Sequence, residues 1–191
     1  MEWNDIVTGR RTIRRFRQRP IPRDVLRRIL DGVRRASCAA NLQRLRFVVA
    51  QRSETVKAIF DTTAWAAMVR PRRTPTWGVD APLCFIAVTA PEELRQAVLA
   101  DAGAAIQTME YAAWNEGIGC CWFASFDPAK VGEVLELPAG SAVIFVVALG
   151  YPAEEPVSDD VEAGGSVRYY LDDDDRLHVP KFTVDALTEW R

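Results

Sequence analysis

The chain has 191 residues, of which 49% are hydrophobic and 26% charged, and its net charge at neutral pH is −2. This length suits one domain with a sizeable core, and the composition excludes disordered, fibrous and membrane proteins. The charge is nevertheless segregated, because residues 10–35 hold eleven arginines against Asp24 and Asp31, whereas residues 154–175 are mostly acidic.

The chain opens on polar residues, Met1 to Asp5, and no apolar leader follows. No apolar run approaches the roughly 18 residues of a membrane span. We therefore expect a cytoplasmic protein with no membrane partner.

The cysteine and histidine residues form no metal-binding or catalytic pattern. No C-x-x-C pair occurs among Cys38, Cys84, Cys120 and Cys121, and His178 is the only histidine. We therefore expect no metal site and no Ser-His-Asp or Cys-His nucleophile. Any chemistry is expected to come from a bound group.

The first half of the chain alternates helical patterns with loops. Apolar spacing predicts a short helix over 2–8, whose exit loop is the arginine cluster, and an amphipathic helix over 22–36. Small and amide-bearing residues then predict a loop over 37–43, followed by a buried strand at 47–50. Ser53 is a candidate N-cap for a helix reaching about Ala67.

The second half begins with a loop over residues 68–80, long enough to be a lid or a binding edge. The patterns after it predict a strand at 83–89, a broken helix over 91–117, a short strand after Gly117, a helix opening at Asp127-Pro128 and a strand at 141–150. Beyond Pro152 the chain is acidic and irregular, and the run Asp172 to Asp175 indicates a solvated turn. Strands separated by helices favour an α/β or α+β sandwich with a central mixed sheet.

The arginine cluster, Gly9-Arg10-Arg11-Thr12-Ile13-Arg14-Arg15-Phe16, is the strongest local chemical signal. Guanidinium groups stay protonated at neutral pH, so their repulsion is relieved by water, by carboxylates or by a polyanion. Phosphate fits guanidinium geometry, because its oxygens accept paired hydrogen bonds. The alternative is an ordinary solvated basic face.

Two common nucleotide motifs do not fit. Gly117-Ile118-Gly119 lacks the third glycine, since Trp122 stands there, and a helical pattern precedes it where a dinucleotide fingerprint follows a strand. No G-x-x-x-x-G-K-[ST] loop is present, which argues against a nucleoside triphosphatase.

Four motifs in order nevertheless resemble one family. They are R-R-T-x-R at residues 10–14, A-x-x-A-x-N-x-Q ending at Gln43, G-I-G-x-x-W at 117–122 and G-Y-P at 150–152. Together they resemble the nitroreductase family of FMN-dependent oxidoreductases, whose motifs have this order and comparable spacing. The resemblance implies an α+β fold, a three-layer sandwich whose central mixed, mostly antiparallel sheet is flanked by helices. It also implies one domain over 1–191, with 151–191 an irregular extension that packs on a partner subunit.

Carried over residue by residue, the resemblance makes Arg10, Arg11, Thr12 and Arg14 the cradle of the FMN phosphate and ribityl chain. Arg15 is expected to be a surface charge. Late in the chain, Lys181 stands where the family places a basic residue on the phosphate or near flavin N1. A cation near N1 would stabilise the anionic reduced flavin.

The resemblance places the other FMN contacts in the second motif and after the G-I-G segment. Ser37, Cys38, Asn41 and Gln43 would reach the flavin ring from the second subunit of a homodimer, and Ala124 and Ser125 would offer a main-chain N–H to flavin N5. The motif departs from the family pattern, because Ser37, Cys38, Arg44 and Leu45 replace its proline, serine, proline and tryptophan.

The function implied is a homodimeric flavoprotein that takes hydride from NADH or NADPH and passes it to a small, planar, electron-poor acceptor by a ping-pong mechanism. No side chain is expected to act as the catalytic acid or base. Family members that fragment flavin, dehalogenate aromatics or oxidise peptide heterocycles leave other acceptors open. Outside enzymes, the alternative is a phosphate-, nucleotide- or nucleic-acid-binding protein that uses the Arg10 to Arg35 segment. Against nucleic acid stand the negative total charge and the lack of aromatics interleaved with those arginines.

Overall fold

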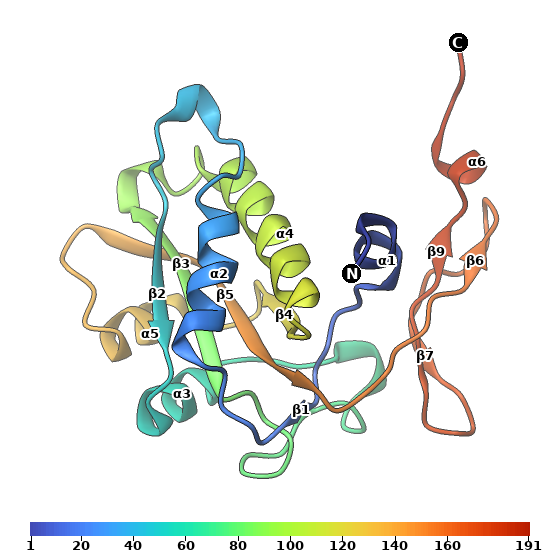
Figure 1. Ribbon diagram of the computed structural model, residues 1–191, viewed down its shortest axis with the longest axis horizontal. Coiled ribbons are helices and arrows are strands. Elements are labelled where there is room, and N and C mark those ends of the chain that lie inside the picture. Colours follow the sequence, from blue (N-terminus) through green and yellow to red (C-terminus); the bar gives the residue numbers. More distant parts are fainter.

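A computed structural model describes all residues, 1–191, and shows a helix-flanked sheet with a C-terminal segment beside it (Figure 1). The elements of the body are α1 (Trp3–Gly9), β1 (Phe16–Arg17), α2 (Arg23–Val33), β2 (Arg46–Ala50), α3 (Ser53–Phe60), β3 (Cys84–Pro91), α4 (Leu99–Asn115), β4 (Gly119–Phe123), α5 (Pro128–Val134) and β5 (Ser141–Pro152). The C-terminal segment contains β6 (Asp160–Val161), β7 (Tyr170–Leu171), β8 (Leu177–His178), β9 (Lys181–Phe182) and α6 (Val184–Leu187).

Strand β5 organises the sheet. It pairs with β1, β3 and β4, and β2 lies on the outer side of β3. All the strand pairs of this sheet are antiparallel. The long apolar run of β5 suits this position, because a strand paired on both edges and covered on both faces needs apolar side chains throughout. The α+β class expected from the resemblance is confirmed.

Side chains alternate between two cores, one on each face of the sheet. Along β3, Ile86 and Val88 face one core with α2 and α4, whereas Phe85 and Ala87 face the other with α3 and α5. This is the period of two that a strand imposes on its side chains. The result is the expected three-layer arrangement, in which helices cover both faces (Figure 1).

Two local expectations were wrong. The helix over 53–67 ends at Phe60, and Ser53 is its first residue, while the N-cap position is Arg52 with no side-chain cap. Strand β2 is not buried as expected, because it forms the outer edge of the sheet and Val49 is 37% exposed.

The C-terminal segment, residues 153–191, stands beside the body as paired short strands (Figure 1). Its apolar residues Val184, Leu187 and Trp190 are largely exposed. No helix of the structure combines the length and the apolar character needed to cross a bilayer.

Candidate functional site: an arginine cradle and an amide loop

The arginine cluster lies in an extended segment against the sheet. The N–H of Ile13 donates to the carbonyl of Cys120 in β4 at 2.9 Å, and Phe16 pairs with Pro152 in β5. Ile13 and Phe16 are almost completely buried, so they anchor the segment from below. The arginines are left on its outer side, at the boundary between the body and the C-terminal segment.

The motif glycines make this close approach possible. A Cβ atom added at Gly119 would lie 2.5 Å from Ile13, and one added at Gly150 would lie 2.6 Å from Phe16. Both distances are shorter than any normal carbon contact. The glycines of G-I-G and G-Y-P therefore let residues 9–16, which carry the arginine cluster and which we call the arginine segment, pack closely on β4 and β5. This gives the two motifs a packing explanation.

A cavity of about 380 Å³ opens above the end of α1. Its lining joins Arg10, Arg11 and Thr12 to Ser158 and Lys181, which come from the other end of the chain. Three positive side chains thus converge with the three hydroxyl residues of the lining, the third being Thr8, and Asp160 is its one carboxylate. We call this cavity the arginine cradle. Its lining unites four residues that the resemblance assigned to FMN.

The two arginines of the cradle make polar contacts, but each keeps a buried N–H group without a hydrogen-bond acceptor. Arg11 donates to the Ser158 hydroxyl and to the carbonyls of Thr8 and Arg10, while Arg10 lies 3.5 Å from the Glu110 carboxylate. The Nε atoms of both arginines are buried without a hydrogen-bond partner. Burial, and then the charge of Arg10, lower the pKa of Arg11. An anion in the cradle would oppose this shift by favouring the charged form of Arg11.

Arg14 lies apart from this cavity. Its guanidinium stands 5.4 Å from the ring centre of Tyr169, which belongs to the C-terminal segment. Arg15 is not the simple surface charge that was expected, since its Nε lies 3.3 Å from Asp80 and its Nη2 donates to the carbonyl of Arg72 at 2.6 Å.

The second motif lines a separate cavity of about 210 Å³. Ser37, Cys38 and Gln43 contribute to its wall, whereas Asn41 lies outside the lining and accepts a hydrogen bond from Gln43 at 3.1 Å. We call residues 37–43 the amide loop. In Figure 1 the amide loop lies at the top of the view, well away from α1 and β9.

Backbone conformation marks the amide loop as unusual. Ala40, Asn41 and Gln43 all have left-handed φ angles, between 46° and 54°. Non-glycine residues in this region cost of the order of 1 kcal/mol or more each and gather at ligand-binding sites. The loop is fastened by one buried carboxylate, because Asp101 accepts the N–H of Ala39 at 2.9 Å.

Helix α4 contacts both the amide loop and the arginine cradle through its only two charged residues. Asp101 holds the amide loop, and Glu110 faces Arg10 of the cradle. Both side chains are buried, and burial raises the pKa of Glu110 although Arg10 opposes the shift. The sequence analysis missed both residues. Two isolated carboxylates in an otherwise uncharged helix were the available signal.

The remaining predicted site residues, Ala124 and Ser125, are exposed and follow β4 directly. The carbonyl of Ser125 accepts the N–H of Ala64 at 2.9 Å, which ties this stretch to the loop after α3. Neither residue lines the cradle or the cavity at the amide loop.

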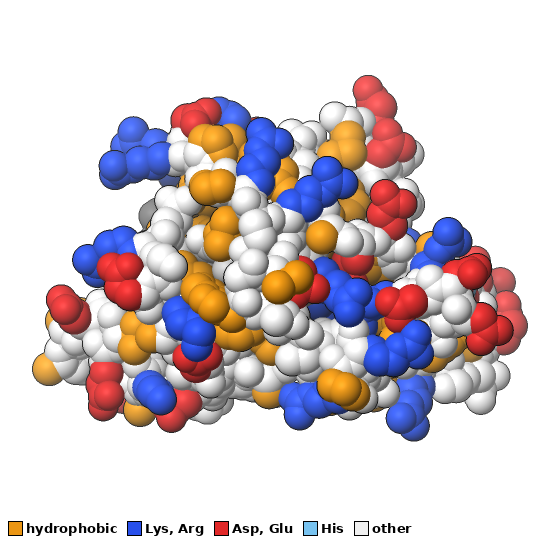
Figure 2. Space-filling view, turned by 90° about the horizontal axis from the view of Figure 1, so that it is seen from below, with side chains coloured by type: hydrophobic (Ala, Val, Ile, Leu, Met, Phe, Trp, Pro, Cys, Tyr) orange, Lys and Arg blue, Asp and Glu red, His pale blue; other side chains and the backbone are white.

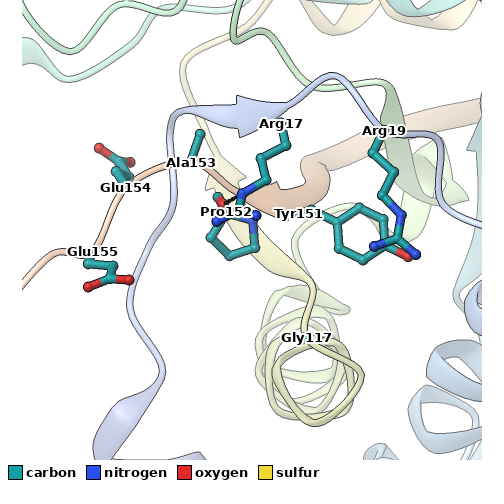
Figure 3. A pocket seen from close by; sticks show the side chains of 8 residues that line it. All are labelled: Arg17, Arg19, Gly117, Tyr151, Pro152, Ala153, Glu154 and Glu155. Atoms are coloured by element: carbon teal, nitrogen blue, oxygen red, sulfur yellow. Dashed lines mark hydrogen bonds between the residues drawn. The ribbon is translucent and has the colours of Figure 1, made fainter.

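A third cavity, of about 700 Å³, is lined by none of the predicted site residues (Figure 3). Its cations are already engaged: Arg19 stacks 4.1 Å from the centre of the Tyr151 ring, and Arg17 Nε donates to the carbonyl of Pro152 at 3.0 Å. Glu154 and Glu155 add negative charge to its lining. It therefore fits a polyanion less well than the arginine cradle does.

The acidic run was expected to be a solvated turn, and this was wrong for two of its four residues. Asp175 pairs with Arg72 and Arg73, and Asp172 accepts from His178 Nε2 at 3.0 Å. Figure 2 shows acidic side chains gathered at the right of the view, where the C-terminal segment lies, with basic side chains beside them.

Comparison with known proteins identifies the family of the chain. The family model described as "Nitroreductase family" matches residues 7–151, more than half of the chain. A protein of Thermus thermophilus named "NADH dehydrogenase" is 29% identical, with 76% of this chain and 84% of that protein covered. A "Putative NADH dehydrogenase/NAD(P)H nitroreductase" of Methanothermobacter thermautotrophicus is 26% identical over 95% of this chain and 88% of that protein.

Among solved structures, a nitroreductase family protein from Clostridium novyi NT superposes with a TM-score of 0.68 at 26% identity. The match covers 80% of this chain and 86% of that one. The matched residues 7–151 run from the end of α1 through the arginine cluster, the amide loop and G-I-G to Tyr151 of G-Y-P. The chain belongs to the nitroreductase family.

Proposed function

We propose that the protein is a homodimeric FMN-dependent oxidoreductase that takes hydride from NADH or NADPH and passes it to a small electron-poor acceptor, of nitroaromatic or quinone type, by a ping-pong mechanism. The enzyme class and the cofactor follow from the family. The donor, the acceptor, the order of the steps and the dimer are the proposal.

The observation that carries the proposal is the arginine cradle. Arg10, Arg11 and Lys181 bring three positive charges to one cavity, and Thr12 and Ser158 add hydroxyl groups. A phosphate monoester carries about −1.5 to −2 charges at neutral pH and offers three acceptor oxygens. It would accept hydrogen bonds from the guanidinium groups of Arg10 and Arg11, which line the cavity. The residues present therefore fit the phosphate end of FMN.

The homodimer is supported by the separation of the two motif sites. The arginine cradle and the amide loop lie at different places on one protomer (Figure 1). A flavin held at its phosphate by one protomer would meet the amide loop of a second. Amide groups suit the edge of the flavin ring, which presents a donor and acceptors. The exposed Val184, Leu187 and Trp190 of the C-terminal segment would pack on that second protomer.

The division of labour follows from this arrangement. Bound FMN supplies the hydride chemistry, and the side chains named here bind and orient it. The names of the Thermus thermophilus and Methanothermobacter thermautotrophicus relatives support a nicotinamide donor. His178 lies outside the cradle lining, paired with Asp159 and Asp172, so no catalytic proton transfer is assigned to it.

The first test is an FMN titration of the purified protein, followed by flavin absorbance and fluorescence. The wild type is expected to bind one FMN per protomer. Arg10→Met and Lys181→Met are each expected to weaken binding by about tenfold or more, since a hydrogen bond to a charged group contributes about 1.5–3 kcal/mol. Arg27→Met is the control, because Arg27 is exposed on α2 and makes no ion pair. A wild type without FMN affinity would contradict the proposal.

The second test uses mixed dimers. Arg10→Met damages the cradle and Gln43→Ala damages the amide loop, so each homodimer is expected to bind FMN poorly. In a mixed dimer, one of the two sites combines an intact cradle with an intact amide loop. Recovery of FMN binding and of NAD(P)H oxidation in the mixed dimer is expected. No recovery in a mixture that demonstrably forms mixed dimers would argue against a site shared between protomers.

The third test concerns the reaction. With NADH or NADPH and a nitroaromatic or quinone acceptor, initial-rate plots at several acceptor concentrations are expected to give parallel lines, as a ping-pong mechanism requires. Intersecting lines would exclude this order of steps while leaving the cofactor assignment intact.

A further inference from the structure

The arginine segment has a gap in its backbone pairing. Its N–H groups are held by β4 at Ile13 and by the carbonyl of Asp80 at Phe16. Between these two points, the N–H groups of Arg14 and Arg15 find no strand partner. A side chain takes them instead: Glu154 Oε1 accepts from Arg14 at 2.5 Å and from Arg15 at 3.2 Å.

Glu154 is buried on its other side against a buried cation. Its carboxylate is 7% exposed, and its Oε2 lies 3.3 Å from Nε of Arg73, whose side chain is 4% exposed. Arg73 in turn pairs with Asp175 at 2.8 Å and also donates to the carbonyl of that residue. These contacts therefore tie the arginine segment to the start of the C-terminal segment at Glu154, and Arg73 of the loop after α3 joins Glu154 to Asp175, later in that segment.

The neighbouring residue shows how specific this arrangement is. Glu155 is exposed and makes no ion pair or hydrogen bond. Figure 3 shows the two carboxylates pointing in different directions, both away from Arg19 and Tyr151. Only Glu154 reaches the backbone of the arginine segment.

We infer that Glu154 is a positioning residue for flavin binding, which rests on the function proposed above. Its carboxylate completes the backbone pairing of the arginine segment by accepting the N–H groups of Arg14 and Arg15, and Arg73 neutralises its buried charge. The wall of the cradle that carries Arg10 and Arg11 is thereby held in the conformation that a phosphate group needs. Glu154 itself lies outside the cradle lining and acts through the backbone.

The experiment separates the two roles of the Glu154 carboxylate, as hydrogen-bond acceptor for Arg14 and Arg15 and as the charge partner of Arg73. Glu154→Ala removes the acceptor for two partly buried N–H groups and is expected to weaken FMN binding by about tenfold or more, because a polar group left without a hydrogen-bond partner away from water destabilises the conformation that leaves it so. Arg73→Met combined with Glu154→Gln keeps an amide oxygen as acceptor and removes both buried charges. This double variant is expected to bind FMN within about threefold of the wild type. Glu155→Ala is the matched control and is expected to match the wild type.

Amide hydrogen exchange without flavin is the second readout. Glu154→Ala is expected to speed exchange at residues 13–16, whereas the double variant and Glu155→Ala are expected to leave it near the wild-type rate. Unchanged exchange in Glu154→Ala, or unchanged FMN affinity in that variant, would overturn the inference. So would equal losses of FMN affinity in Glu154→Ala and the double variant, because a merely structural role predicts losses that follow stability alone. A wild type that fails to bind FMN would contradict the proposed function, and the exchange measurement would still decide the placement of the segment.

Discussion

The sheet and the C-terminal segment are held in place by different forces. Phe85, Ile86 and Leu149 of the sheet are completely buried between two helical layers. The C-terminal segment instead relies on charged contacts, in which His178 bridges Asp159 and Asp172, and Asp175 binds Arg72 and Arg73. Apolar burial resists salt and pH, whereas partly exposed ion pairs respond to both.

This difference matters because the cradle has one wall on each region. Arg10, Arg11 and Thr12 rest on the sheet through Ile13 and Phe16, while Ser158 and Lys181 belong to the C-terminal segment. The sheet wall is therefore firm and the other wall is adjustable. A bound phosphate would join them, so conditions that loosen the C-terminal segment are expected to weaken FMN binding without unfolding the sheet.

Substitution of the glycines on which the sheet wall of the cradle packs is expected to have the largest effect on stability. Gly150→Ala places a methyl group 2.6 Å from Phe16, and Gly119→Ala places one 2.5 Å from Ile13. Each is expected to lower the free energy of unfolding by about 1–3 kcal/mol, the usual range for overpacking a core. Denaturant unfolding measures the change, and FMN affinity is expected to fall with it.

Gly103→Ala is the control for this pair of variants. Gly103 lies inside α4, where an added Cβ would be 4.0 Å from its nearest neighbour, Trp122. Alanine is favoured over glycine in a helix by up to about 1 kcal/mol. The variant is therefore expected to be as stable as the wild type or more so. If Gly150→Ala behaved like Gly103→Ala, the packing account of the motif glycines would be wrong.

The wall formed by the C-terminal segment is expected to become less stable as pH rises, and this effect is smaller than that of the glycine substitutions. Both ring nitrogens of His178 face carboxylates, Nδ1 at 2.8 Å from Asp159 and Nε2 at 3.0 Å from Asp172, and the ring stacks on Tyr170. Hydrogen bonds from Asp172 and Asp159 raise the pKa of His178, so the folded state favours the imidazolium. Its contribution is fully present below about pH 6.5, the unfolded pKa, and is lost as pH rises through the raised folded value.

Limited proteolysis of the C-terminal segment across this pH range checks the prediction. Cleavage is expected to be slow in mildly acidic buffer and faster in alkaline buffer, after correction for the pH dependence of the protease. His178→Gln is expected to flatten the profile, because glutamine cannot gain a proton. A wild-type profile identical to that of His178→Gln would rule out this histidine as the source.

Salt is expected to produce the smallest effect. The pair of Arg72 and Asp175 is about half exposed, and such pairs contribute about 1 kcal/mol or less. Raising ionic strength is expected to speed amide exchange in residues 170–182 and to leave the sheet unchanged. Equal acceleration in both regions would mean that the two are not held by different forces.

The sequence predicted the elements whose signals are local. The amphipathic pattern of α2 and the apolar runs of β3 and β5 located these elements correctly, and Asp127 caps α5 as expected, accepting the N–H of Lys130 at 3.1 Å. The local pattern of the arginine cluster already indicated an anion site at Arg10, Arg11 and Thr12, whereas Lys181 was predicted only through the family resemblance, since no local pattern relates it to that cluster. The structure brings these four to one cavity.

What the sequence could not supply were partners distant along the chain. Glu154 satisfies backbone groups 139 and 140 residues away, and Asp175 pairs with an arginine 102 residues away. Carboxylates in an acidic stretch resemble solvated charges until tertiary packing chooses among them. The edge position of β2 likewise depends on strand order, which composition does not determine.

The central claim is that the arginine cluster holds a phosphate, and the most direct measurement compares FMN with riboflavin, which shares its ring and lacks that group. Titration of the wild-type protein at low ionic strength is expected to show FMN binding at least about tenfold more tightly, given about 1.5–3 kcal/mol for a hydrogen bond to a charged group. Arg10→Met is expected to narrow this preference. Equal affinity of the wild type for FMN and riboflavin would contradict the claim.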